Sequence, residues 1–224
     1  YLDYGLGSID LEKIYSFDPI PTDLAKEYYS YIIGGECNMW TEHVPDEDNL
    51  DSKVFPRMIG LAEVLWTYPE QRDFNDFYRR LQNHYPVLEE LEINYGLETI
   101  GATLTQELRD TGVFIILNRN LPDLTLKFRW DNAQDTNYLN YETPIQLIRS
   151  GKLQVQALKN GKPYGNVIEQ EFVKHSGLNK TVTYATEYNE WYTGNAEKNL
   201  VDGKTGSIDF RDDNWQGFWG NDID

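Results

Sequence analysis

The chain has 224 residues, a formal net charge of −17 and an apolar content of 40%, with 16 tyrosines and 6 tryptophans. This length and composition predict one large or two small globular domains with a sizeable core, and they exclude a disordered chain. The acidity disfavours nucleic acid and anionic membranes as partners. Residues 1–100 carry 7 basic and 20 acidic side chains, whereas residues 101–224 carry 13 and 17. This uneven charge indicates two different halves.

Residues 1–100 alternate strand-like and helix-like patterns, which predicts an α/β fold. A short helix is expected at residues 10–15 and a second helix or turn at 22–29. The apolar residues of 31–39 predict a strand, and the acidic run over 41–49 predicts a loop.

Two further helices follow from the periodicity of apolar residues. Residues 55–67 carry two apolar stripes, so this helix is expected to pack on two sides, with Pro56 tolerated only in its first turn. An amphipathic helix is expected from residue 71 to about 85, where Pro86 ends or restarts it.

The pattern changes to short period-two runs after about residue 100. Residues 125–130 and 153–157 alternate apolar and polar side chains, and Asn160-Gly161 is a strong signal for a type I′ hairpin. Strands are also expected at 166–172 and 180–185. Because no helix-length pattern separates these runs, they predict an antiparallel β sandwich.

The final segment, residues 183–224, is rich in glycine, asparagine and aspartate, with scattered aromatic residues. It predicts the loops of a further β unit that is too short to close its own core. The abrupt start at Tyr1, without a signal peptide, and the aromatic-rich end lead us to expect a piece cut from a longer protein.

Cysteine and histidine usage limits the chemistry. Cys37 is the single cysteine, so no intrachain disulfide or thiolate metal site is expected, and it is interpreted as a small hydrophobic residue. The three histidines lack metal-ligand spacing, and we expect neither a metal nor a cofactor. No apolar run approaches the roughly 20 residues that a membrane-spanning helix needs.

Trp40 and Glu42 form the most informative pair in the sequence. Residues two apart on a strand point to the same side, so both would stand together at the end of the predicted strand. An indole face beside a carboxylate suits a sugar ring, which offers apolar C–H faces and a rim of hydroxyls. The alternative is a core tryptophan next to a solvated glutamate, and the pair alone leaves both interpretations open.

Several segments together resemble glycoside hydrolase family 20, the β-N-acetylhexosaminidases and chitobiases. In order, they are Tyr1-Leu2-Asp3, Gly34-Gly35-Glu36 through Trp40-Thr41-Glu42, Phe55-Pro56-Arg57 and Ala62-Glu63-Val64-Leu65-Trp66. The family fold is a (β/α)₈ TIM barrel. The resemblance therefore implies that residues 1–100 are the C-terminal part of such a barrel, with the functional residues at the C-terminal ends of strands.

The resemblance also implies roles for four residues. The family uses substrate-assisted retention, in which the 2-acetamido oxygen of the substrate attacks the anomeric carbon. By resemblance, Tyr1 donates its hydroxyl to the acetamido carbonyl, and Asp3 and Glu42 hold ring hydroxyls. Trp40 forms a wall of the pocket around the sugar.

The catalytic Asp-Glu pair of the family has no counterpart here. Asp46-Glu47 is the only Asp-Glu dipeptide of the chain. It lies in the predicted acidic loop and is interpreted as solvated. Arg57 and Glu63 are expected to pair within the scaffold.

The β regions also resemble known modules. Residues 101–182 resemble the immunoglobulin-like domain that follows the barrel in many bacterial members of the family. Residues 183–224 resemble the opening of a discoidin-type, galactose-binding-like domain, through Leu200-Val201-Asp202-Gly203 and Trp215-Gln216-Gly217-Phe218.

We therefore expect part of a secreted or periplasmic bacterial β-N-acetylhexosaminidase that acts on terminal N-acetylglucosamine or N-acetylgalactosamine. The chain alone is expected to be inactive and to self-associate through the incomplete barrel, without nucleic acid or a membrane span. A non-catalytic carbohydrate-binding or adhesion module is the alternative, and a purely structural fragment is a third interpretation.

Overall fold

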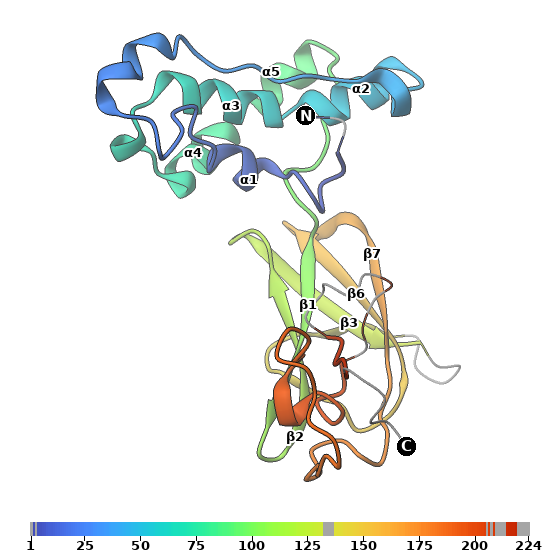
Figure 1. Cartoon of the computed structure of the whole chain (residues 1–224). Helices are drawn as coiled ribbons and strands as arrows, with labels where there is room; N and C mark the ends of the chain where they lie inside the picture. The colour runs from blue at the N-terminus through green and yellow to red at the C-terminus, as the bar shows by residue number, and fades with distance from the viewer. Residues whose placement is uncertain are drawn as a thin grey trace. The chain divides into compact units, whose positions relative to one another are not determined.

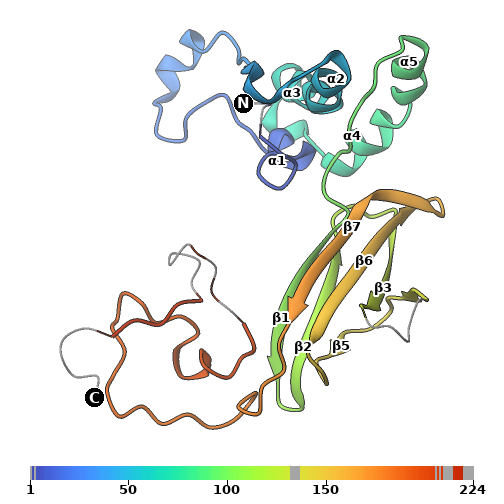
Figure 2. The ribbon, with the colours of Figure 1, turned by 90° about the vertical axis from the view of Figure 1, so that its right-hand side faces the viewer.

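The structure is a computed structural model that describes residues 2, 4–131, 137–204, 206, 208 and 214–218. The chain forms two compact units, residues 1–100 and 101–224 (Figures 1 and 2). Helices dominate the described part of the first unit, and antiparallel strands dominate that of the second. No helix in these ranges is long and apolar enough to cross a membrane.

The first unit consists of helices joined by long connections. Its elements are α1 (Leu11–Tyr15), the 3₁₀ helices η1 (Lys26–Tyr31) and η2 (Thr41–His43), α2 (Glu47–Val54), α3 (Arg57–Trp66), η3 (Pro69–Gln71), α4 (Phe74–Leu81) and α5 (Tyr85–Glu90). An aspartate starts α1, α2 and α4. The carboxylates of Asp10, Asp46 and Asp73 each accept a hydrogen bond of 2.8 Å from the backbone N–H three residues later.

The core of the first unit lies where α1 and α4 pack near α3. Gly60 of α3 approaches α1 so closely that a Cβ there would lie 2.8 Å from Cδ1 of Leu11. Leu11 and Leu81 are almost fully buried, and the rings of Tyr15 and Phe77 stack with their centroids 4.9 Å apart. Because interiors are packed to near-crystalline density, α1 and α3 form one tightly packed pair.

The strand predicted at residues 31–39 is not formed. Tyr31 ends η1, and residues 32–40 carry no regular secondary structure. A β ladder needs a neighbouring strand, and the described backbone supplies a single bond from another segment, from Leu2 N–H to the Asn38 carbonyl. Among the described residues no ladder pairs with this segment, and apolar residues alone do not make a strand.

The helices also differ from prediction in their limits. Most of the loop expected at 41–49 is replaced by η2 and the start of α2, because Asp46 caps that helix. The helix expected at 55–67 is confirmed as α3, with Pro56 immediately before it. The helix expected at 71–85 is shorter, and Pro86 lies in the first turn of α5, so the proline restarts the helix.

The second unit contains two antiparallel sheets. Its strands are β1 (Ala102–Arg109), β2 (Gly112–Arg119), β3 (Leu124–Trp130), β4 (Leu139–Asn140), β5 (Ile145–Gln146), β6 (Gly151–Lys159) and β7 (Lys162–Phe172), followed by the 3₁₀ helix η4 (Ala196–Lys198). One sheet has the order β1-β2-β5 and the other β4-β3-β6-β7. Figure 2 shows β6 and β7 side by side within this unit.

Alternation places the core of this unit. On β2, Val113, Ile115 and Leu117 are buried, and on β6 the buried row is Leu153, Val155 and Ala157. The two sheets are joined by a hydrogen bond of 3.1 Å from the Leu117 N–H to the Tyr141 hydroxyl.

The β6–β7 hairpin confirms the predicted turn. Asn160 and Gly161 have φ angles of 52° and 78°, and Lys159 pairs with Lys162 across them. Both central residues therefore have the positive φ that a type I′ turn requires. β7 begins at Lys162, four residues before the start expected for that strand.

The strand predicted at residues 180–185 is not formed either. Instead, the described residues after β7 form turns, irregular stretches and the short helix η4, and two of them bind the β1–β2 hairpin through polar groups. Gln106 donates to the Gly203 carbonyl at 2.9 Å, and the side-chain amide of Asn179 donates to the carbonyls of Arg109 and Asp110. These side-chain contacts replace a ladder in this part of the chain.

Two adjacent residues test the core of the second unit. Leu147 is 4% exposed and Ile148 is 66% exposed. Leu147→Ala should lower the free energy of unfolding by about 2–5 kcal/mol, because it leaves a cavity. Ile148→Ala should change it by less than about 0.5 kcal/mol. Urea denaturation of both variants measures the difference, and equal effects would contradict this core.

Candidate functional site

Two of the four predicted sugar-site residues are described. Trp40 lies in extended backbone just before η2, and 58% of it is exposed. Glu42 is the middle residue of η2 and is exposed. Tyr1 and Asp3 lie outside the described residues.

The predicted arrangement, with Trp40 and Glu42 on the same side of a strand, is not formed. The chain turns into a 3₁₀ helix between them, and that helix rotates by about a third of a turn per residue. The prediction is wrong because Thr41 begins η2 where the strand was expected to continue into a loop. The alternative, a core tryptophan, does not fit the exposed indole either.

One backbone hydrogen bond brings the two predicted sugar-binding segments together. The N–H of Leu2 donates to the carbonyl of Asn38 at 2.9 Å, and Leu2 is only 4% exposed. Leu2 is the central residue of the motif Tyr1-Leu2-Asp3, and Asn38 precedes Trp40 by two residues. Leu2 therefore lies against the segment that leads into η2.

A hollow of about 540 Å³ adjoins this junction. It lies between α1, the loop that follows α1 and the segment of Glu36 and Cys37, and Leu2 forms part of its wall. Asn38 donates from Nδ2 to Oε1 of Glu36 at 3.2 Å, so these two residues lie on one side of the segment. Trp40 and Glu42 are absent from the residues that line the hollow.

Arg57 is the residue whose importance sequence reasoning missed. It is 2% exposed, and its guanidinium donates to the carbonyls of Leu2 at 2.6 Å, Tyr4 at 2.8 Å and Ile9 at 2.9 Å. It also donates to the Lys53 carbonyl at the end of α2. The expected scaffold role is confirmed, but its partners are backbone groups next to the predicted site. An arginine at this position in the sequence gives no hint of such distant carbonyl acceptors.

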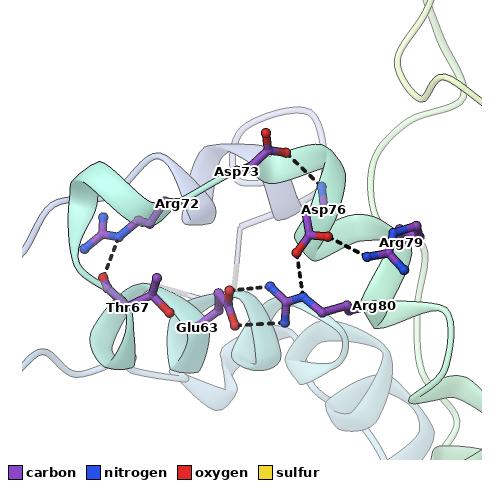
Figure 3. A network of polar contacts seen from close by, with 7 residues as sticks. All are labelled: Glu63, Thr67, Arg72, Asp73, Asp76, Arg79 and Arg80. Atoms are coloured by element: carbon purple, nitrogen blue, oxygen red, sulfur yellow. Dashed lines mark hydrogen bonds and ion pairs between the residues drawn. The ribbon is translucent and has the colours of Figure 1, made fainter.

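Glu63 is confirmed as a scaffold residue (Figure 3). Its carboxylate accepts two hydrogen bonds from Arg80, at 2.6 and 3.3 Å, which join α3 to α4. Arg80 also donates to Asp76 at 2.8 Å, and Arg79 donates to the same carboxylate at 2.6 Å. The hydrogen bond from Arg80, followed by that from Arg79, lowers the pKa of Asp76.

Asp46 of the Asp46-Glu47 dipeptide also has a structural role. The Asp46 carboxylate accepts from the side chain of Asn49 at 2.7 Å as well as from its backbone N–H. These two bonds lower the pKa of Asp46, with the side-chain bond as the larger cause. Asp46 is thus the cap of α2. In the described ranges, no three His, Cys, Asp or Glu side chains gather as metal ligands do.

A family model describes the first unit. The model of the glycosyl hydrolase family 20 catalytic domain matches residues 3–69. These residues contain Trp40, Glu42 and Arg57. The first unit of this chain therefore carries part of a family 20 catalytic domain, and the resemblance noted in the sequence is confirmed.

The curated relatives are β-hexosaminidases. A beta-hexosaminidase of Porphyromonas gingivalis is 35% identical over 159 residues, which are 69% of this chain and 20% of the relative. A beta-N-acetylhexosaminidase of Cellulomonas fimi is 38% identical over 80 residues, or 36% of this chain and 16% of the relative. The human beta-hexosaminidase subunit beta is 34% identical over 84 residues, or 38% and 15%. The chain thus spans a fifth or less of the length of these relatives.

The ion-pair network predicts a pH effect on the first unit. Because the folded pKa of Asp76 is lowered, its stabilising contribution is complete above the unfolded pKa of about 4 and is lost as pH falls through the folded value. Asp76→Asn should therefore flatten the fall in stability below about pH 4. Urea midpoints measured from pH 2 to 7 check this.

A neighbouring variant provides the control for this effect. Asn75→Ala changes the preceding residue of α4 but removes no titratable group. It should keep the slope of the unaltered chain, and a slope equal to that of Asp76→Asn would contradict the assignment.

Proposed function

We propose that this chain is part of a β-N-acetylhexosaminidase that hydrolyses terminal non-reducing N-acetylglucosamine or N-acetylgalactosamine. The family match over residues 3–69 and the names of the relatives support the reaction class. The single structural observation that carries the site is the bond from Leu2 to Asn38. It joins Leu2, the central residue of the motif Tyr1-Leu2-Asp3, to the segment that leads to Trp40 and Glu42.

Each proposed role suits the chemistry of its side chain. The Tyr1 hydroxyl is a neutral donor at physiological pH, so it stabilises the acetamido oxygen as that oxygen attacks the anomeric carbon. The carboxylates of Asp3 and Glu42 accept hydrogen bonds from ring hydroxyls. The indole of Trp40 offers an exposed apolar face that excludes water from the cationic transition state.

This chain supplies half of the proposed active site. The acid that protonates the leaving oxygen and the aspartate that orients the acetamido group come, in this proposal, from an earlier strand of a TIM barrel. Asp46 does not fit that task, because its carboxylate caps α2 and is bound to Asn49. We accordingly expect no hydrolysis by the chain alone.

The remaining parts of the proposal concern the modules. Residues 1–100 form the C-terminal part of the barrel, and the two antiparallel sheets within residues 101–182 form an immunoglobulin-like domain. Residues 183–224 form the start of a discoidin-like domain. The proposed location is secreted, periplasmic or cell-surface, and the resemblance to the family supports it.

Glycan binding without chemistry is the second candidate function. It is favoured by exposed indoles in the last segment, since Trp191 is 81% exposed and Trp215 is 46% exposed. Binding of N-acetylglucosamine oligomers to this chain, weakened by Trp191→Ala but not by Glu42→Gln, would support it over the sugar pocket proposed above.

Substitutions in the full-length protein that carries this chain test the proposed function. Glu42→Gln and Tyr1→Phe should each lower kcat/KM for a chromogenic N-acetylglucosaminide by about 10²-fold or more, because each removes an interaction aimed at the reacting sugar. The fold should be retained, as judged by circular dichroism. Steady-state kinetics with purified variants measures the loss.

Glu47→Gln is the matched control for these variants. Glu47 is an exposed carboxylate in the first turn of α2, five residues beyond Glu42. The Glu47→Gln variant should hydrolyse the substrate at the same rate as the unaltered enzyme. Unchanged hydrolysis by both Glu42→Gln and Tyr1→Phe would refute the assigned roles.

A further inference from the structure

We propose that Arg57 is the positioning residue of the sugar site. Its guanidinium holds the carbonyls of Leu2 and Tyr4 in place, so that Leu2 stays beside the segment that leads to Trp40 and Glu42. This inference rests on the proposed function, and it assigns to Arg57 no contact with the sugar itself.

All five N–H groups of the guanidinium are used. Nε donates to the Lys53 carbonyl at 2.8 Å, and Nη1 donates to the carbonyls of Tyr4 and Ile9 at 2.8 and 2.9 Å. Nη2 donates to the Leu2 carbonyl at 2.6 Å and also to Lys53. A planar fork of five fixed donors therefore binds four carbonyl groups in one arrangement.

These four carbonyls belong to two stretches of the chain, one at residues 2–9 and one in α2. Leu2 and Tyr4 flank Asp3, so Arg57 fixes the peptide groups next to that residue. Lys53 is the penultimate residue of α2, the helix that begins five residues after Glu42. Arg57 thus connects the start of the chain to the helix that follows the second sugar-binding segment.

The bond between Leu2 and Asn38 completes this connection. Leu2 accepts from Arg57 through its carbonyl and donates to Asn38 through its N–H. The peptide groups on both sides of Leu2 are therefore bound, and Leu2 itself is buried. A displacement of the guanidinium would be passed directly to the contact between the two segments.

Lysine cannot reproduce this arrangement. Its ammonium is a compact charge with three donors on a flexible stem, whereas the guanidinium offers five donors in a rigid plane. Arg57→Lys therefore keeps the charge and much of the apolar stem but leaves some of the four carbonyls without their donor. This substitution separates positioning from charge.

Arg72 offers a matched control on the same unit. It also donates to backbone carbonyls, namely those of Thr67 at 3.0 Å, Phe17 at 2.9 Å and Val64 at 2.8 Å. These acceptors belong to neither proposed sugar-binding segment. Arg72→Lys therefore disturbs the same kind of hydrogen bond elsewhere in the scaffold.

The kinetic test compares both variants in the full-length protein, well below their melting temperatures. Arg57→Lys should lower kcat/KM for the chromogenic N-acetylglucosaminide on the order of 10²-fold, because small displacements of positioned groups are costly. It should raise KM as well as lower kcat, since sugar-holding residues are displaced. A mere loss of folded enzyme would lower the maximal rate at constant KM. Arg72→Lys should keep KM unchanged.

Hydrogen exchange on the 224-residue chain gives a readout that does not depend on activity. Amides in peptides that cover residues 2–9 and 36–42 should exchange faster in Arg57→Lys, while those of α4 keep their rates. Arg72→Lys should leave both peptides unchanged. If Arg57→Lys does not accumulate in folded form, the shorter, neutral Arg57→Gln replaces it in both measurements.

The outcomes separate the two proposals. Unaltered kcat/KM in Arg57→Lys, or equal changes in KM for both arginine variants, overturns the positioning role even where Glu42→Gln is inactive. If Glu42→Gln and Tyr1→Phe are fully active, the proposed function fails, and the sugar-site role of Arg57 fails with it. Faster exchange at residues 2–9 would then identify Arg57 as an anchor of this loop alone.

Discussion

The first unit depends on a buried guanidinium that binds backbone carbonyls. Carbonyl groups taken out of water need donors, and a loop such as residues 2–9 has no helix or sheet to provide them. Arg57 meets that need for Leu2, Tyr4 and Ile9 from the first turn of α3. The helix thereby determines where the preceding loop can lie, which is the condition for any site built on that loop.

Local chemistry explains which elements could be predicted. The hairpin turn at Asn160-Gly161 is specified by two residues that accept positive φ, so the turn was visible in the sequence. The strand expected at 31–39 depends on a partner far along the chain. The apolar residues of this segment do not show whether such a partner strand is available. Asp46 three residues before Asn49 is an N-cap signal for α2, and it was overlooked because it lies within an acidic run.

The candidate site divides in the same way. Motif order and spacing indicated Trp40 and Glu42, because their proposed roles depend on side-chain chemistry, which the sequence shows. The contacts of Arg57 could not be predicted in this way, since every residue type offers the same backbone carbonyl as an acceptor. The turn at η2 was also missed, and it changes the direction of Glu42 relative to Trp40. The orientation of these two side chains was thus not predictable from the motif that contains them.

The close approach of Gly60 to Leu11 has a mechanical consequence. It leaves no slack between α1 and α3, so the loop of residues 2–9 is tied to one body at both ends: Arg57 holds its beginning, and α1 continues from its end. A short span fixed at two points on the same support has few ways to swing outward.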